Sequence, residues 1–347
     1  MWLLSCRSAP EELIGSATLS AMKLKDAMEG DEIDCHVKAK MASDLLDGEL
    51  RELKLILIGD AEREHDEDRG ARVAAAAIEQ HEFVTSLISC LSFLPLETQK
   101  NVSHVFANLA RRPEGCAFAA VVAQDAAILS SLTAAYKDER ADFALLCGIM
   151  LREFARHEVI ARALLRAPRF WHFFADFVSL KSFEVASVAF ELLKSLLIDH
   201  CTVASAFIEA NYVSFVSHYN KLLQSDNYVI CRESLRILGE LLLQRENFTI
   251  MMKYISDAEN LKIVMILLRN KKSRIQIEAF HVFKVFVVNP HKPDKVSHVL
   301  FNNKDKLVNY FRKFHNDKRD DQFTEEKQLM VDTLLALASP RQPTCDE

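Results

Sequence analysis

Glycine and proline are scarce in this chain of 347 residues, which contains only 8 of each. Their scarcity disfavours a β-rich fold, whose turns need both residue types, and it disfavours glycine-rich loops that cradle phosphate groups. Apolar residues nevertheless make up 50% of the sequence, which is ample for a continuous core. The composition therefore indicates packed α-helices.

The cysteines show no paired spacing. The eight cysteines stand at positions 6, 35, 90, 116, 147, 201, 231 and 345, and no Cys-x-x-Cys pair occurs. We interpret them as reduced packing thiols, which makes the cytosol or the nucleus the default compartment, and we expect a cytoplasmic protein. No metal ion or other cofactor is predicted.

Long hydrophobic runs are missing too. The longest uncharged, mainly apolar segment, Phe83 to Leu96, is shorter than the roughly twenty residues that a bilayer crossing needs, and Pro95 interrupts it. At the N-terminus, the apolar part of MWLLSCR is too short for a signal peptide, and its positive charge follows it. We therefore expect neither a membrane span nor a signal peptide.

Catalytic motifs are absent as well. The sequence has no GxSxG, P-loop, GxGxxG or kinase catalytic loop, and the His157-Glu158 pair does not continue into HExxH. His200 and Cys201 would point about 100° apart on a helix, so we interpret them as structural residues. The segment from Asp60 to Gly70 is acidic but lacks the residue order of an EF-hand, so calcium binding is not supported. The chain is predicted not to be an enzyme.

What the chain does contain is a repeated helical pattern. From Ile230 to Leu243, apolar residues recur every three or four positions, which places them on one side of a helix. The pattern that begins at Ala189 recurs at Ser234 and again at Ala279, 45 residues apart each time. A fixed period in the forties with all-helical content is typical of armadillo and HEAT repeats. We predict an all-α, armadillo/HEAT-like right-handed solenoid that forms a single elongated curved domain.

The domain organisation follows from this pattern. We assign residues 1–10 to an N-terminal extension, residues 11–338 to the helical-repeat domain with about six to seven helical units, and residues 339–347 to a disordered tail.

Positive charge gathers in one region of the chain. Residues 227–320 carry 18 Lys or Arg against 10 Asp or Glu, although the net charge of the whole chain is −6. In the 45-residue repeat, three pairs of residues occupy equivalent positions on successive helices, and all but Gly239 are polar: Glu191 and Lys194, Arg236 and Gly239, His281 and Lys284. In armadillo-like solenoids this helix lines the concave side, where partners dock. The alternative is that these positions are simply solvated.

Three long segments are distinctive: LLCGIMLREFARHE, NYVICRESLRILGELLLQRENFTIMMKYISDAENLK and IQIEAFHVFKVFVVNPHK. They resemble the calcium-binding protein 39 family, the Mo-type scaffold proteins. The resemblance extends from about Asp142 to Leu329 and, more weakly, back to about Glu12. It implies an armadillo-like scaffold that binds and activates protein kinases. The implied partners are a pseudokinase with a Ser/Thr kinase, or sterile-twenty-type kinases directly, in cell polarity, morphogenesis or division.

The resemblance also implies roles for single residues. Tyr228 and Arg232 fall where family members contact a pseudokinase or kinase lobe, and Arg245 and Phe248 fall where the catalytic kinase is engaged. We assign Arg236, His281 and Lys284 to the same kinase-binding face. On sequence alone, Phe248 would otherwise be read as a core aromatic residue.

A second implied site is a pocket for a Trp-Glu-Phe-like C-terminal tail of the partner. Met265 falls in this pocket, although a core position fits its surroundings, VMILL, equally well. Asn302 stands where the resemblance leads us to expect a lysine that meets the acidic residue of the tail, and Lys304 is a candidate substitute.

Two other classes of binding protein remain open at this stage. A solenoid transport adaptor that reads basic or acidic peptides is the first, and a nucleic-acid-binding protein that uses the basic region is the second. We expect no nucleic-acid partner, and we expect the isolated chain to be a monomer.

Overall fold

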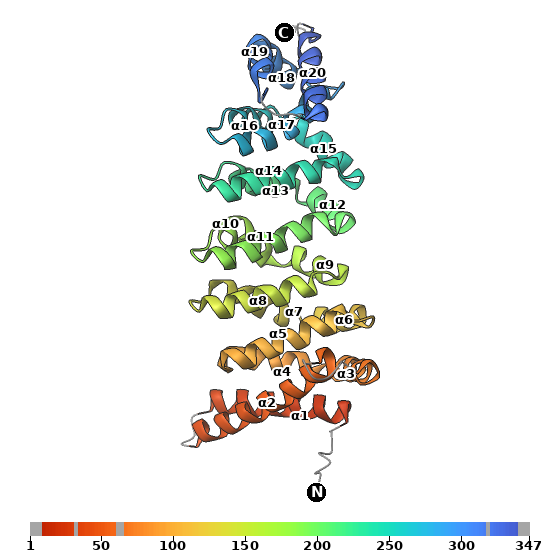
Figure 1. Ribbon diagram of the computed structural model, residues 1–347, viewed down its shortest axis with the longest axis vertical. Helices are drawn as coiled ribbons and strands as arrows, with labels where there is room; N and C mark the ends of the chain where they lie inside the picture. The colour runs from red at the N-terminus through yellow and green to blue at the C-terminus, as the bar shows by residue number, and fades with distance from the viewer. Residues whose placement is uncertain (1–8, 31–33, 60–65, 317–319, 339–347) are drawn as a thin grey trace, which may run out of the picture. The chain divides into compact units, whose positions relative to one another are not determined.

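The stretches with a 3.6-residue apolar period fold as helices (Figure 1). The computed structural model describes residues 9–30, 34–59, 66–316 and 320–338. Within these ranges it contains 20 α-helices, five short 3-10 helices and no strand. The all-α prediction is confirmed.

The first eleven α-helices are α1 (Pro10–Glu29), α2 (Cys35–Ile58), α3 (Glu67–Glu79), α4 (Glu82–Cys90), α5 (Leu96–Arg111), α6 (Gly115–Gln124), α7 (Ala126–Ala134), α8 (Ala141–Phe154), α9 (Glu158–Arg166), α10 (His172–Ala175) and α11 (Phe183–Ile198). The others are α12 (Cys201–Ala210), α13 (Tyr212–Leu223), α14 (Tyr228–Leu243), α15 (Phe248–Ile255), α16 (Ala258–Leu268), α17 (Ser273–Val288), α18 (Asp294–Asn302), α19 (Lys304–Lys313) and α20 (Asp321–Leu335). The 3-10 helices are η1 (Leu91–Phe93), η2 (Ala135–Lys137), η3 (Pro168–Trp171), η4 (Phe177–Ser179) and η5 (Arg245–Asn247).

The internal contacts divide the chain into two units, Met1–Ala204 and Ser205–Glu347. In the first unit, α2 packs on α5, α5 on α8 and α8 on α11. Each of the last three closes a group of three α-helices: α3–α5, α6–α8 and α9–α11.

In the second unit, α14 packs on α17 and α17 on α20, and the groups are α15–α17 and α18–α20. Three helices per repeat, with the third helices packed in succession, is the armadillo arrangement. The predicted 45-residue period is also the spacing between the first residues of α11, α14 and α17. The armadillo-like fold class is confirmed.

Two histidines of the first unit form hydrogen bonds with helix ends. The Nε2–H of His157 donates to the carbonyl oxygen of Ala110 at 2.7 Å, and that of His200 donates to Ala155 at 2.6 Å. Both carbonyls lie at the C-terminal ends of third helices, where backbone acceptors lack partners within the helix. His200 therefore has the structural role that its sequence position indicates.

Helix N-caps follow the sequence less uniformly. Ser182 occupies the N-cap position of α11 and is of a residue type that commonly caps helices, but its side chain makes no capping hydrogen bond. Asn227 does cap α14, because its Oδ1 accepts from the backbone N–H of Val229 at 2.9 Å.

Aromatic residues fill the core of the second unit around α17. Phe280 contacts Phe311, Phe314 and Phe323, and Phe283 stacks on Phe311. These rings come from α17, α20 and the α19 region. The aromatic cluster thus joins the last two repeats and fixes the helix faces that remain exposed.

Membrane-span criteria single out no individual helix within the described residues. Only α6 together with residues 126–137 would pass by length and composition, and this pair is bent by 85°. Residues 1–8 of the predicted extension, the tail from Ser339, and residues 60–65 of the charged segment lie outside the described residues.

The aromatic cluster gives the first testable prediction. Phe280 is 0% exposed, so Phe280→Ala removes a ring from a packed site and is expected to lower the free energy of unfolding by about 3–5 kcal/mol. Phe248→Ala is the matched control, because Phe248 is 63% exposed and its loss is expected to cost less than about 0.5 kcal/mol. Urea unfolding followed by circular dichroism measures both. Equal losses would contradict the assigned core.

Candidate protein-binding surface

One side of α14 carries three of the predicted site residues. Tyr228, Arg232 and Arg236 are spaced four residues apart, so they lie one above another along the helix. The opposite side holds the buried stripe, which includes Ile230, Leu238 and Leu241. Packing against the core therefore fixes the direction in which the three polar side chains project.

Glutamates surround the two arginines. Arg232 donates from Nη1 to Glu233 at 2.8 Å, and its Nη2 lies 3.8 Å from Glu278 of α17. Arg236 donates from Nε to Glu233 at 3.0 Å and from Nη1 to Glu240 at 3.2 Å. The hydrogen bond with Glu233 raises the pKa of Arg236. Both arginines are held in place by neighbouring carboxylates.

The same arrangement continues onto α17 and α20. Lys284 donates to Glu326 of α20 at 2.8 Å, and His281 Nδ1 lies 3.8 Å from the other oxygen of that carboxylate. We call the set Tyr228, Arg232, Arg236, Glu278, His281, Lys284 and Glu326 the charged face. The structure thus brings together five of the seven residues predicted for the kinase-binding face.

Arg245 and Phe248 lie apart from the charged face. They follow the C-terminal end of α14, in η5 and at the start of α15, and this helix end is about 16 Å along the helix axis from Arg232. Arg245 is exposed, and Phe248 exposes 63% of its surface. The alternative that Phe248 is a core aromatic residue is therefore wrong.

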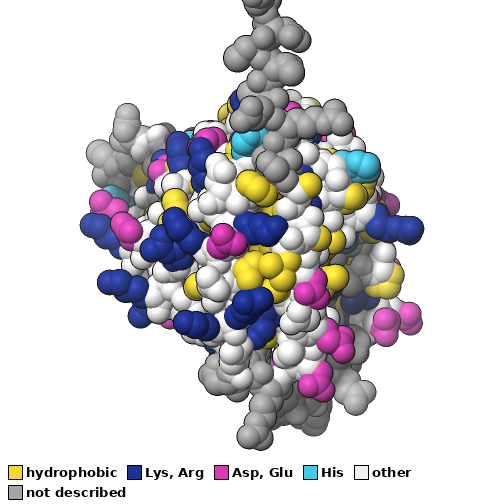
Figure 2. Space-filling model, turned by 90° about the horizontal axis from the view of Figure 1, so that it is seen from above, with side chains coloured by type: hydrophobic (Ala, Val, Ile, Leu, Met, Phe, Trp, Pro, Cys, Tyr) yellow, Lys and Arg dark blue, Asp and Glu magenta, His cyan; other side chains and the backbone are white. Residues whose placement is uncertain are grey.

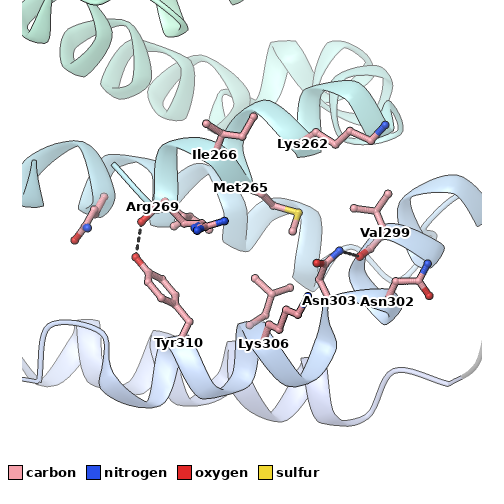
Figure 3. Close-up of a pocket in the computed structure, with 12 residues that line it drawn as sticks. Lys262, Met265, Ile266, Arg269, Val299, Asn302, Asn303, Lys306 and Tyr310 are labelled. Atoms are coloured by element: carbon pink, nitrogen blue, oxygen red, sulfur yellow. Dashed lines mark hydrogen bonds between the residues drawn. The ribbon is translucent and has the colours of Figure 1, made fainter. Parts of the chain in front are cut away.

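A groove of about 1230 Å³ opens between α16, α18 and α19 (Figure 3). The residues that line it, which define the C-terminal groove, are Lys262, Met265, Ile266, Leu268, Arg269, Gln276, Val299, Asn302, Asn303, Lys306, Leu307 and Tyr310. Met265 is half-buried and its sulfur points into the groove, so the alternative of a fully buried core methionine is wrong. Asn302 also lines the groove, but its side chain extends away from Met265 in Figure 3.

The charges that line the C-terminal groove are all positive. Lys262 bonds to Glu259 on its own helix at 2.7 Å. Among the described residues, no carboxylate pairs with Arg269 or Lys306. Tyr310 donates its hydroxyl proton to the carbonyl oxygen of Leu268. The groove therefore offers an apolar lining with two cations that lack an acidic partner.

Lys304 does not replace the lysine that was expected at the position of Asn302. Its ammonium donates to the carbonyl oxygens of Leu335 at 2.6 Å and Leu337 at 3.2 Å, next to the end of α20. It is not among the lining residues. The expectation that Lys304 could substitute for the missing lysine was wrong, and the lysine of α19 that lines the groove is Lys306.

The carboxylates of this region do not gather into a metal site. No group of three or more His, Cys, Asp or Glu side chains that could hold an ion occurs within the described ranges.

On the face shown in Figure 2, Lys and Arg side chains border small apolar areas. The surface can therefore contribute ion pairs, hydrogen bonds and apolar contacts.

Helical repeats with an exposed charged face and a cationic groove are typical of scaffold proteins. The chain belongs to the Mo25-like family, whose family model matches residues 4–338. It is therefore a scaffold protein of the Mo25 kind, as the resemblance indicates.

Curated relatives cover most of the chain. It is 42% identical over 297 residues to calcium-binding protein 39-like of Mus musculus, covering 85% of this chain and 87% of that protein. It is 39% identical over 285 residues to the Mo25-like protein of Schizosaccharomyces pombe, covering 81% and 85%. A solved designed armadillo repeat protein matches with 13% identity and a TM-score of 0.46, covering 80% of this chain and 100% of the other.

Sequence reasoning missed the acidic half of the charged face. A signal was present, because Glu278 lies 45 residues after Glu233, and Glu326 lies 45 residues after His281. Extending the repeat frame to acidic residues would have placed Glu278 beside Arg232 and Glu326 beside His281 and Lys284. Arg269 and Lys306 were missed because no pattern marked them as groove residues.

Glu278 gives a prediction with a defined pH dependence. Burial raises its pKa above the ordinary value of 4.5, against the opposing effect of Arg232 and Arg236. The folded chain therefore retains the proton when the unfolded chain has lost it, and stability falls as pH rises from about 4.5 through the raised value. Glu278→Gln removes this loss, so its Tm is expected to exceed that of the parent chain at pH 7.5, with the difference shrinking at pH 4.

Asp138 provides a control of opposite sign. Its hydrogen bond with Arg140 lowers its pKa, so Asp138→Asn is expected to destabilise the chain at pH 7.5 and to lose that effect at low pH. Differential scanning fluorimetry across pH 4 to 8 measures both variants. A lower Tm for Glu278→Gln at pH 7.5 would show that the pair with Arg232 outweighs the desolvation.

Proposed function

We propose that this chain is a non-catalytic scaffold that binds and allosterically activates protein kinases. The partners would be a Ser/Thr kinase with a pseudokinase, or a sterile-twenty-type kinase alone. The charged face, together with Arg245 and Phe248, would contact the kinase fold. The C-terminal groove would hold a Trp-Glu-Phe-like tail of the partner.

The geometry of the charged face supports the first contact. Tyr228 is partly exposed beside Arg232, and Arg–aromatic pairs are typical of interface hot spots. The Nε of Arg232 is buried without a hydrogen-bond acceptor, so its guanidinium is not fully satisfied in the isolated chain. A carboxylate or carbonyl oxygen of a partner could bond to the arginine after a small rearrangement of its side chain.

The lining of the C-terminal groove supports the second contact. Its apolar residues suit aromatic side chains, and the thioether of Met265 packs well against rings. Arg269 and Lys306 suit the carboxylate of the glutamate or the terminal carboxylate of such a tail. This combination of apolar lining and unpaired cations is the single observation that carries the proposal.

Activation requires unequal affinity for two states of the kinase. A scaffold shifts a kinase from 1% to 99% active only if it binds the active form about 5.5 kcal/mol more tightly. A tail held in the groove raises the local concentration of the kinase at the charged face, which then discriminates between the two forms.

The same proposal includes the absence of catalysis and a cytoplasmic location, with association to the cell cortex or cytoskeleton through partners. In support, the six cysteines within the described residues are all unpaired, as suits a reducing compartment. Cys90, which is buried, has its pKa raised to about 12 by desolvation and would be unreactive.

Tail binding tests the assignment of the groove. A fluorescent peptide that ends in Trp-Glu-Phe is titrated with the chain and followed by fluorescence polarisation. Arg269→Gln with Lys306→Gln is expected to raise the Kd at least tenfold, because two charge-assisted contacts are lost. Asn302→Lys is expected to lower the Kd by adding a cation at the groove edge. Arg312→Gln, on α19 but outside the groove, is the control.

Kinase binding tests the whole proposal. Arg232→Ala with Met265→Ala is expected to abolish co-purification of a sterile-twenty-type kinase or pseudokinase and the rise in kinase activity, while the helical circular dichroism stays unchanged. Arg162→Ala, which removes an exposed arginine of α9, is expected to leave both intact. Retained binding by the double variant would refute the site, and recovery of transport cargo in place of a kinase would refute the function.

A further inference from the structure

A second groove lies in the first unit, between α7 and the end of α9. Its volume is about 460 Å³, and the residues that line it are Ala123, Ala126, Leu129, Ser130, Thr133, Ala163, Leu164, Arg166, Ala167, Pro168 and Arg169. We call it the N-terminal groove. Its volume lies at the lower end of the range of about 300–1000 Å³ that is usual for ligand pockets.

The floor of the N-terminal groove is apolar. Leu129 and Leu164 are buried there, and the alanines of α7 and α9 leave room above them. Thr133 is also buried, but its hydroxyl donates to the carbonyl oxygen of Leu129 at 2.6 Å, so its hydrogen bond is already satisfied. A group that enters the floor must therefore be apolar.

The rim of the N-terminal groove is cationic. Arg166 is the last residue of α9, and Arg169 belongs to η3. No carboxylate is among the lining residues, and within the described part of the chain neither arginine forms an ion pair. The nearby Asp125 caps α7 through Ala127 at 2.8 Å and accepts from Thr85 at 3.2 Å. The groove therefore has positive charge on one side only.

The two grooves occupy equivalent places in the repeat. The C-terminal groove lies between α16, the second helix of its group, and α18 and α19 of the next group. The N-terminal groove lies between α7, also a second helix, and α9 and η3 of the following group. Both combine an apolar floor with two cations for which the described residues supply no acidic partner. The repeat thus produces the same kind of cleft in each unit.

We propose that the N-terminal groove is a second peptide-docking site, which takes a short acidic segment of another protein. One aliphatic or small aromatic side chain would enter the floor over Leu129 and Leu164. Flanking Asp or Glu carboxylates would pair with Arg166 and Arg169, in the charge-assisted geometry that guanidinium groups favour. The site is independent of the kinase-binding proposal, since none of its residues belongs to the charged face or the C-terminal groove.

Methyl NMR locates the binding site directly. The probe is a fluorescein-labelled pentapeptide, Gly-Ser-Glu-Leu-Glu amide, and its uncharged match is Gly-Ser-Gln-Leu-Gln amide. On titration into the full chain labelled at Ala, Leu and Thr methyls, the acidic peptide is expected to shift Leu129, Thr133, Ala163 and Leu164. Shifts confined to Leu268 and Leu307 of the C-terminal groove would overturn the proposal.

Charge variants test the recognition of the acidic groups. Arg166→Gln with Arg169→Gln is expected to raise the Kd of the acidic pentapeptide at least tenfold, whereas Arg162→Gln on the same helix, where Arg162 bonds to Glu158, is the matched control. Ser130→Trp, at the exposed rim, is expected to block the groove and abolish the shifts. Equal binding of the two peptides would refute the role of the arginines. Chemical-shift changes in the groove methyls that grow with protein concentration, without peptide, would overturn the proposal and identify a second copy of the chain as the occupant.

Discussion

The apolar contact between successive third helices is the constraint on which the rest of the second unit depends. α14, α17 and α20 each carry a stripe that no single helix can bury, so each packs against the next. Phe280 and Phe283 fix the orientation of α17 within this stack. Once the stripes are buried, the polar sides of the three helices must align, and the charged face is the result.

The same constraint explains how much of the fold could be predicted from the sequence. The 45-residue period determines where the third helices begin and which side of each helix is buried, because every repeat buries an equivalent apolar stripe against its neighbour. The period holds only where the pattern is helical. The apolar pattern of the sequence is interrupted at η5. There the side chain of Phe248 is exposed, although the nearby Asn247 and Ile250 are buried. Burial at such a break depends on the course of the backbone, which hydrophobicity alone does not determine.

The C-terminal groove was less predictable for a related reason. Lys304 and Lys306 are two residues apart on α19, which separates them by about 200° around the helix. One therefore reaches the end of α20 and the other lines the groove. The sequence here, NNKDKL, is rich in Asn and Lys and has no apolar period that would show which lysine lies on which side of α19. The position of Met265, between core and surface, likewise depends on how far α18 and α19 lie from α16.

Charge balance separates the two parts of the proposed binding surface. On the charged face, Arg232, Arg236 and Lys284 already contact glutamates, so a partner gains only the difference between new and existing ion pairs. In the proposed complex, such a face would contribute little to affinity but would discriminate strongly, because a misplaced partner leaves buried charges unpaired. In the C-terminal groove, the described residues supply no such partner for Arg269 or Lys306, and the proposed acidic tail would gain their full attraction. In the proposed complex, the C-terminal groove would thus provide affinity and the charged face would provide conformational selectivity. A tail could hold a kinase at the scaffold while the charged face binds one conformation of that kinase preferentially.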